Sequence, residues 1–170
     1  MVLNSGKKAA PSVLPFCVCR IEENMANCQD LKIADELIKA VLDSFIPEHA
    51  TSSIPVFIAG DHSSVIHQDQ IALSDIGLDA KHLLGKTDLV FKVDDPKEPW
   101  LCFVSCEHSC GHINTKRKQE LDKIASSIKL KCAYLSVFAN MESYSKVCDS
   151  IAWRTDVWVT DQPTKIISFD

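Results

Sequence analysis

Glycine, proline and long apolar runs are all scarce in this chain. Its 170 residues include 5 Gly and 7 Pro, which is too few for a collagen-like or low-complexity polymer. No apolar run approaches the ~20 residues that cross a bilayer as a helix, so the sequence predicts no transmembrane segment. Residues 1–15 hold Lys7 and Lys8 but only a short apolar run after them, unlike a secretory signal. We therefore expect a cytoplasmic protein with no membrane contact.

Excess positive charge is also absent. The formal net charge of −5 argues against a basic protein that coats nucleic acid, although it leaves room for a local basic face. Hydrophobic residues make up 46% and charged residues 24% of the chain, which are values of a globular protein. The length fits one domain with one core. Most of the 8 cysteines lie in apolar runs, and without a secretory signal we expect reduced thiols.

The spacing of apolar residues predicts a layered α/β domain. Residues 30–46 carry apolar side chains at steps of three and four, which indicates a helix that Pro47 ends. Short apolar runs bounded by turn residues predict strands. We expect strands at 55–59, 88–93, 100–106, 132–138, 155–160 and 165–169, and further helices near 69–76, 114–128 and 142–153. This order predicts one domain over residues 30–170, with a central mixed β-sheet flanked by helices, after a leader at residues 1–29.

Three side chains could meet at one end of two neighbouring strands. Residues 94–99 contain two Asp and two Pro and predict a hairpin turn. In such a hairpin Asp88, which opens the first strand, lies near the end of the second. Ser105 and Glu107 stand two residues apart there, so we expect both to point to the same face. Converging carboxylates could hold Mg²⁺ for phosphodiester hydrolysis, whereas an Asp before a strand is also common as a cap.

The predicted helix that follows is basic. Residues 116–131 hold six Lys or Arg against Glu120 and Asp122, a local charge of +4. Clusters of this kind contact phosphates in nucleic-acid-binding proteins. A solvated helix face would show the same pattern, so the spacing leaves both interpretations open.

Five stretches between residues 54 and 170 resemble, in order, the motifs of a known family. The most specific is close to that family's I-A-W-E-T-E-V-W-I-A-D. Another reads S-C-G-H-I-N-T-K-R where the family has S/T-H-G-P-I-S-P-K-R. The five stretches are Gly60–Asp61, Thr87–Val90, Trp100–Val104, Ser109–Arg117 and Ile151–Asp161. They resemble the C-terminal catalytic domain of the BsuBI/PstI type II restriction endonucleases.

This resemblance implies a restriction-endonuclease-like PD-(D/E)XK core that cleaves double-stranded DNA with Mg²⁺ in a restriction-modification system. It also implies a homodimer and a cognate methyltransferase. Asp88 inherits the role of the metal-binding aspartate. Lys116 and Arg117 match a basic pair to which we assign phosphate contacts, with Lys116 counted among the catalytic residues. Only about 50 residues precede the match, where the family's enzymes carry a substantial N-terminal region, so we expect DNA recognition to need a partner or a second copy.

The sequence differs from the family's motifs at positions that are expected to carry the chemistry. Ser105 stands where the family has its second acidic residue, Cys110 where it has His, and His112 where it has Pro. A serine hydroxyl is a poor substitute for a carboxylate on Mg²⁺. Two explanations follow. Either the fold persists without cleavage, as a relic that binds DNA or protein, or the carboxylate has moved to Glu107, which then joins Asp88 on the metal.

A third possibility is a zinc site. Cys106, His108, Cys110 and His112 lie within seven residues, and two Cys with two His can bind Zn²⁺ tetrahedrally. Their spacing is tighter than that of usual zinc motifs. The competing interpretation is a cysteine-rich strand end with incidental histidines.

The two tryptophans of the most specific stretch have two possible roles. An exposed indole can stack on DNA bases, whereas a buried one packs in the core. Trp153 and Trp158 lie at an apolar junction between a predicted helix and a predicted strand. We therefore expect both in the core.

Overall fold

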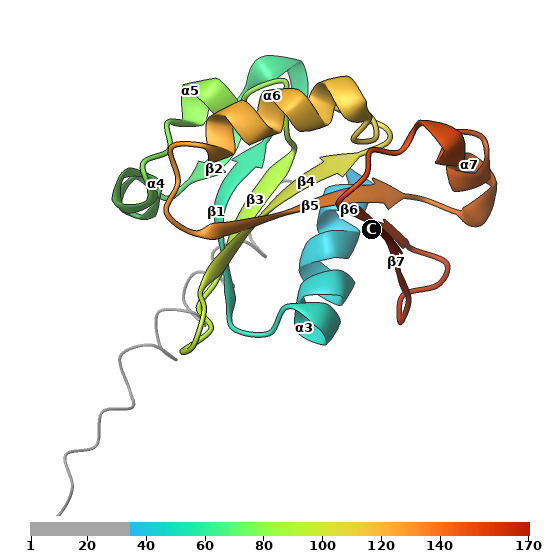
Figure 1. The fold of residues 1–170 in the computed structure, drawn as a ribbon, viewed down its shortest axis with the longest axis horizontal. Helices are drawn as coiled ribbons and strands as arrows, with labels where there is room; N and C mark the ends of the chain where they lie inside the picture. Colours follow the sequence, from blue (N-terminus) through green and yellow to red (C-terminus); the bar gives the residue numbers. More distant parts are fainter. Residues whose placement is uncertain (1–34) are drawn as a thin grey trace, which may run out of the picture.

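The computed structural model describes residues 35–170, which form a seven-stranded sheet with helices on both sides (Figure 1). The predicted leader at 1–29 and the start of the helix predicted at residue 30 lie outside the described residues. The strands are β1 Ser53–Ala59, β2 Val65–Gln68, β3 Leu89–Val93, β4 Trp100–Cys106, β5 Lys131–Phe138, β6 Thr155–Val159 and β7 Ile166–Phe169. The α-helices are α2 Glu36–Ala40, α3 Ile46–His49, α4 Gln70–Ile76, α5 Ala80–Leu83, α6 Thr115–Ala125 and α7 Met141–Ser145.

The sheet is mixed, as the sequence predicts. Its order is β2-β1-β3-β4-β5-β6-β7. Strands β4, β5 and β6 are parallel to one another, and the other neighbours are antiparallel. The predicted hairpin is confirmed, because β3 and β4 pair from Val93 opposite Trp100 to Leu89 opposite Val104. The start of β3 and the end of β4 therefore lie side by side.

Strand β2 is not predicted from the sequence, because it is a short, half-exposed edge strand with no continuous apolar run. Gly60 makes its close return from β1 possible. A Cβ at Gly60 would lie 2.5 Å from the Ser64 Oγ and 2.8 Å from the Ile66 Cγ1. Only glycine fits without a shift of these neighbours.

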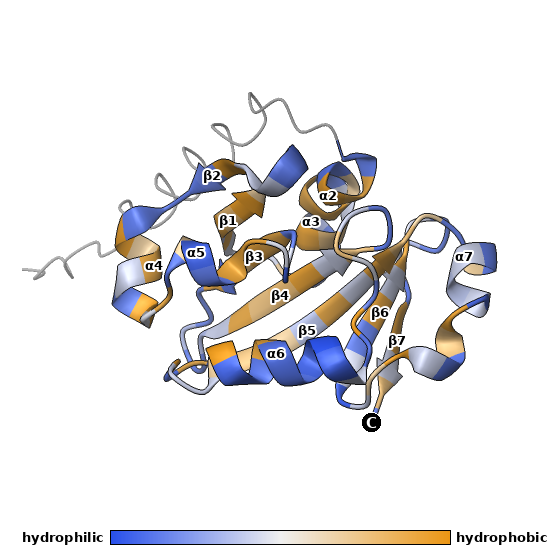
Figure 2. Cartoon of the chain, turned by 90° about the horizontal axis from the view of Figure 1, so that it is seen from above, coloured by the Kyte–Doolittle hydropathy of each residue, from blue (hydrophilic) through white to orange (hydrophobic). Residues whose placement is uncertain are grey.

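Two apolar layers cover the two faces of the sheet. On one face the helical segment 36–49 packs over Val104 and its neighbours, and on the other α4, α5 and α6 pack over Phe103 and its neighbours. Figure 1 shows α5 and α6 on one side of the sheet and α3 on the other. Strands β3 and β4 are hydrophobic in Figure 2, whereas α6 is mostly hydrophilic along its outer side. Alternate side chains of the central strands thus enter separate layers.

Pro47 does not end the first helix, contrary to the prediction. Helix α2 continues through a π-helical turn, Val41–Phe45, into α3, which ends at His49. In that wide turn the Ile46 N–H bonds the carbonyl of Val41, five residues back. The shifted hydrogen-bond pattern accommodates a proline, which has no N–H to donate.

The helix predicted over 142–153 is also shorter than expected. Helix α7 ends at Ser145, and a 3₁₀ turn spans Cys148–Ser150. Arg154 then takes a φ of 59° and turns the chain into β6. Trp153 is 71% exposed as a result, so the expectation that it packs in the core is wrong. Trp158 is 1% exposed and makes an edge contact with Phe45, with ring centroids 5.4 Å apart, as predicted for a core residue.

The cysteines within residues 35–170 are all free thiols. Cys102 and Cys106 are buried in the layer under α2, and Cys110, Cys132 and Cys148 are half-buried. Within the same residues, no helix is long and apolar enough to cross a membrane.

Candidate functional site

Asp88 directly precedes β3 at the edge of the sheet where β4 ends, and it is 1% exposed. Its carboxylate accepts hydrogen bonds from the backbone N–H of Cys106 at 2.7 Å and of Cys110 at 3.3 Å. The hydroxyl of Ser109 donates a third, at 2.6 Å. The three donors are Cys106, the last residue of β4, and Ser109 and Cys110 of the turn that follows it. Asp88 therefore fastens residues 106–110 to the sheet through both of its carboxylate oxygens.

Arg117 holds the same turn from the side of α6. Its guanidinium donates to the carbonyl of Cys110 at 3.1 Å and to the carbonyl of Gly85 at 2.7 Å. Burial, together with the nearby Asp88 carboxylate, raises the pKa of the Cys110 thiol to about 12. Cys110 is therefore a neutral structural thiol in this turn and not a reactive thiolate.

Ser105 is fully buried one residue before β4 ends. Strand alternation turns it to the same side as Phe103, and it stands opposite Ser136 of β5. Ser136 accepts a hydrogen bond from the N–H of Ile113 at 2.9 Å. The Ser105 hydroxyl has no hydrogen-bond partner among the described residues. The position where the family's pattern has a carboxylate is thus a small, closed space.

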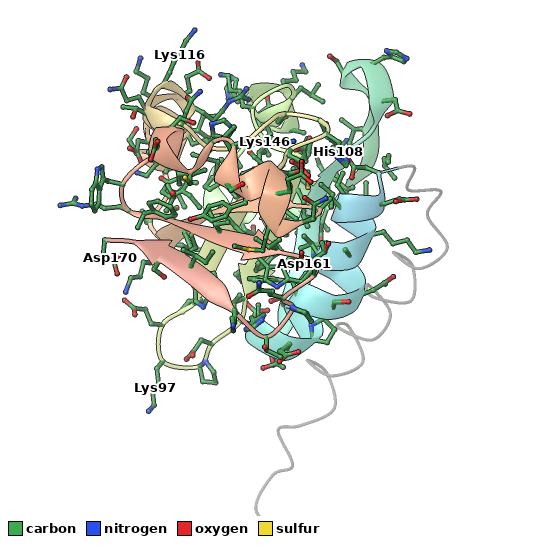
Figure 3. All side chains as sticks on the ribbon, turned by 90° about the vertical axis from the view of Figure 1, so that its right-hand side faces the viewer. Lys97, His108, Lys116, Lys146, Asp161 and Asp170 are labelled. Atoms are coloured by element: carbon green, nitrogen blue, oxygen red, sulfur yellow. The ribbon has the colours of Figure 1, made fainter. Side chains whose placement is uncertain are left out.

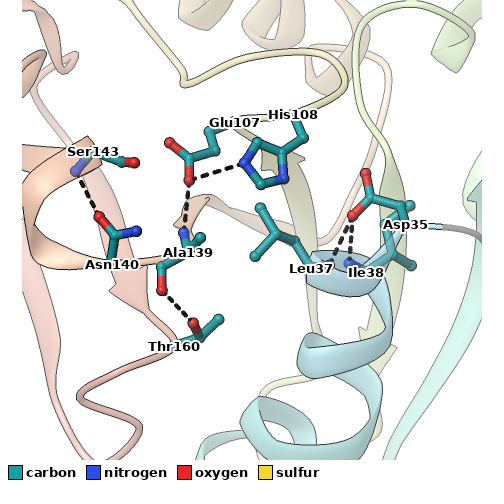
Figure 4. A network of polar contacts seen from close by, with 9 residues as sticks. All are labelled: Asp35, Leu37, Ile38, Glu107, His108, Ala139, Asn140, Ser143 and Thr160. Atoms are coloured by element: carbon teal, nitrogen blue, oxygen red, sulfur yellow. Dashed lines mark hydrogen bonds and ion pairs between the residues drawn. The ribbon is translucent and has the colours of Figure 1, made fainter.

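Glu107 lies beyond β4, which ends at Cys106, so strand alternation stops before it. Its carboxylate accepts the N–H of Ala139 at 2.8 Å and lies 3.5 Å from the Nε2 of His108 (Figure 4). Ala139 directly follows β5. Glu107 and Asp88 therefore have separate sets of partners in this structure.

The four side chains of the predicted zinc set also diverge. Cys106 packs in the layer under α2, and His108 lies beside Glu107. His112 contacts the hydroxyl of Ser150 through its Nε2 at 2.8 Å. Within residues 35–170, no three His, Cys, Asp or Glu side chains are grouped to hold a metal ion. The predicted zinc arrangement does not form.

Of the basic side chains at the start of α6, one faces solvent and the others contact neighbouring residues. Lys116 is exposed in the first turn, after the Asn114 cap that the sequence predicts. Lys118 instead bonds Asp122 at 2.6 Å and lies 4.2 Å from the centre of the Tyr134 ring. Burial pushes the pKa of Asp122 upward, but hydrogen bonds from Lys118 and Tyr134 outweigh this and hold it below its usual value. Of the predicted phosphate-binding pair, Lys116 faces solvent and Arg117 binds backbone carbonyls.

A cavity of about 540 Å³ opens beside the Asp88 turn. Asp35, Asp61, His108 and Ser109 are among the residues that line it. Asp35 uses one carboxylate oxygen to cap α2 by accepting the N–H groups of Leu37 and Ile38 (Figure 4). Residue spacing predicts no role for these lining residues, although Gly60–Asp61 and Ser109 stand in stretches that resemble the family.

Residues 24–170 match the BsuBI/PstI restriction endonuclease domain family. The chain belongs to this family. The type II restriction enzyme BsuBI of Bacillus subtilis is 26% identical over 135 residues, which are 79% of this chain and 42% of that enzyme. The SdaI restriction endonuclease structure superposes with a TM-score of 0.69 at 21% identity, over 79% of this chain and 42% of that chain. The fold inferred from the sequence is confirmed, and the chain spans less than half the length of either relative.

Restriction endonucleases generally use Mg²⁺, so the BsuBI/PstI domain can be tested for fit to that ion. Mg²⁺ requires carboxylate oxygens with free lone pairs at one point. Here the two oxygens of Asp88 accept three donors from the 106–110 turn, and Ser105 is neutral and buried. Glu107 is engaged at the end of β5. In this arrangement the described residues do not fit the ion.

Proposed function

We propose that this restriction-endonuclease-like domain binds duplex DNA and does not cleave it, because Asp88 serves the structure and does not hold a catalytic metal ion. The main support for this proposal is that the Asp88 carboxylate accepts hydrogen bonds from three donors. A buried carboxylate that satisfies a turn has a structural reason to be present. Its presence therefore gives no support to a metal-binding role, and Ser105 supplies no second carboxylate.

DNA as the partner is supported by the family and by the charge distribution. The chain carries −5 overall, yet residues 116–131 carry +4. Lys116 points to solvent from the first turn of α6 (Figure 3). Phosphate contacts of this type are independent of DNA sequence and weaken as salt rises. A homodimer and a cognate methyltransferase belong to this proposal, and sedimentation of the purified protein with and without duplex DNA tests the dimer.

The decisive experiment combines cleavage and binding on the same protein. We expect supercoiled plasmid to remain intact with Mg²⁺ or Mn²⁺, while a labelled duplex binds with a steep salt dependence. Mg²⁺-dependent nicking that Asp88→Asn abolishes and the exposed Asp75→Asn retains would overturn the proposal. Failure to bind duplex DNA at low salt would overturn its DNA part.

A second candidate function is cleavage with Glu107 as the replacement carboxylate. It is favoured by one observation: Asp88 and Glu107 both stand at the same end of the β3–β4 hairpin. Metal binding would require Asp88 to release Ser109 and Glu107 to release Ala139. This candidate predicts nicking that is lost in both Asp88→Asn and Glu107→Gln, and a signal from either variant equal to wild type rules it out.

A further inference from the structure

A second cavity lies on the α6 side of the domain, away from the Asp88 turn. Its volume is about 480 Å³. It runs between the α4–α5 connection and the outer side of α6. Its lining residues are Gly77, Leu78, His82, Lys86, Glu120, Lys123, Ile124 and Ser127. None of them belongs to the site described above.

The charges around this cavity favour an anion. Lys86, Lys123 and His82 come from the turn before β3, from α6 and from α5. Within residues 35–170, neither lysine forms an ion pair, whereas Lys118 and Lys146 do. Glu120 is the single carboxylate in the lining. One carboxylate beside two lysines leaves net positive charge and is too few oxygen ligands for a divalent cation.

The cavity is held in shape by one contact outside its lining and one within it. Arg117 donates to the carbonyl of Gly85 at 2.7 Å and so ties the turn that carries Lys86 to α6. Gly77 ends α4 with a φ of 80° and packs near the Ser127 carbonyl. The two lysines therefore project from backbones that are fixed relative to each other, which reduces the entropy lost when a ligand binds.

The cavity continues the stripe of α6 that begins at Lys116. Glu120 and Lys123 follow Lys116 at steps of four and seven residues, so these three lie on one side of the helix, and Ser127 follows just beyond the helix end at Ala125. Lys116 and Lys123 are about 10 Å apart along the axis, at 1.5 Å per residue. Measured along the duplex axis, that separation equals roughly three nucleotide steps of one DNA strand, at a rise of 3.4 Å each.

We infer that this cavity binds a phosphate group through Lys86, Lys123 and His82, and that the phosphate is a backbone phosphodiester of bound DNA. The inference rests on the proposed DNA binding and adds a defined subsite to it. Lysine ammonium groups donate to phosphate oxygens without regard to base identity. The subsite therefore positions the duplex along α6 and does not read its sequence.

The test measures duplex binding against salt for Lys86→Ala, Lys123→Gln and the double variant. Each lost phosphate contact should reduce the slope of log affinity against log salt by about 0.9, which is about an eightfold loss at 0.1 M salt. Lys97→Ala is the matched control, because Lys97 lies at the opposite end of the molecule from Lys116 (Figure 3). Lys123 is exposed, so its replacement should leave the fold intact.

A second measurement separates the two sources of phosphate. Inorganic phosphate is titrated while the backbone amide resonances of residues 77–86 and 120–127 are followed by NMR. A reduced salt slope in the pocket variants and an unchanged one in Lys97→Ala support the DNA subsite. Amide shifts with phosphate that the variants abolish, without any change in duplex binding, overturn DNA as the source and keep the phosphate site.

No effect of the variants in either measurement overturns the inference while leaving the proposed DNA binding in place. If the wild-type protein fails to bind duplex DNA, the proposed function fails and with it the DNA source. The phosphate titration alone then decides whether the cavity is a phosphate site.

Discussion

The hydroxyl of Ser109 donates to the carboxylate of Asp88 at 2.6 Å, across 21 residues of sequence. With the N–H groups of Cys106 and Cys110 it completes the environment of a carboxylate that is 1% exposed. Buried carboxylates are stable only when such donors offset their lost hydration. The relationship makes Asp88 a structural anchor of the turn beside the cavity that Asp35 and Asp61 line.

Asp88→Ala should therefore destabilise the fold. Removing the carboxylate leaves the buried N–H of Cys106 and the half-buried N–H of Cys110 without an acceptor, so the free energy of unfolding should fall by roughly 3–5 kcal/mol. Ser109→Ala removes one donor and should cost about 1–2 kcal/mol. Urea unfolding measures both, with Asp75→Ala, at an exposed position of α4, as a control expected within about 0.5 kcal/mol of wild type. An Asp88→Ala protein as stable as wild type would contradict the anchoring role.

Ser105→Ala and Ser105→Glu should move stability in opposite directions. The Ser105 hydroxyl is buried without a partner among the described residues, so Ser105→Ala should be neutral or raise stability by about 0.5–1 kcal/mol. Ser105→Glu forces a larger, chargeable group into the closed space beside Ser136 and should cost about 3 kcal/mol or more. Thermal and urea unfolding test both variants. Mg²⁺-dependent plasmid cleavage gained by Ser105→Glu would show that the position still belongs to a metal site.

Replacing Lys116 should weaken DNA binding and replacing Arg117 should lower stability, although the two residues are neighbours. Lys116→Ala removes an exposed cation and should lower duplex affinity about eightfold at 0.1 M salt, with unfolding unchanged. Arg117→Ala loses two hydrogen bonds to the carbonyls of Gly85 and Cys110 and should cost about 1–3 kcal/mol of stability. Fluorescence anisotropy with a labelled duplex and urea unfolding are measured for each variant. A loss of stability in Lys116→Ala together with unchanged stability in Arg117→Ala would contradict the positions of these side chains.

His112 should make stability fall in mild acid. Burial lowers the pKa of His112 below the ordinary histidine value of 6.5, so the folded state resists protonation of this ring. Its contribution is present above the unfolded-state pKa of about 6.5 and is lost as the pH falls through the lower folded-state value. Compared with His112→Gln, which does not titrate, the wild-type protein should lose stability as the pH falls from neutral into the mildly acidic range below about 6.5. A stability difference that stays constant across this range would contradict the prediction.

The two tryptophans of the 151–161 stretch should differ sharply. Trp158→Ala empties a fully packed site and should cost about 3–5 kcal/mol. Trp153, which is 71% exposed, should tolerate alanine within about 0.5 kcal/mol. Because the chain also contains Trp100, the comparison is made in a Trp100→Phe background. There acrylamide should quench the fluorescence of Trp153 in a Trp158→Phe protein and leave that of Trp158 nearly unquenched in a Trp153→Phe protein. Equal quenching of the two would contradict their placement.

Local patterns predicted most of the sheet and the caps of several helices. Continuous apolar runs marked β1, β3, β4 and β5, because side chains of a central strand are buried on both faces. Asn114 caps α6, and Gly77 ends α4, as their types suggest. Pro47 was misleading because the π-helical turn that accommodates it leaves no clear trace in the apolar spacing.

The sequence by itself determined the layered α/β fold, the β3–β4 hairpin and the family, because apolar periodicity, turn residues and motif order are properties of neighbouring residues. The tertiary structure alone decided what the polar residues do. Asp88 meets Ser109, Glu107 meets Ala139 and Arg117 meets Gly85 only after the sheet and α6 have packed. A hydrogen bond depends on distance and direction between atoms, and residue spacing cannot specify either when the partners are many residues apart.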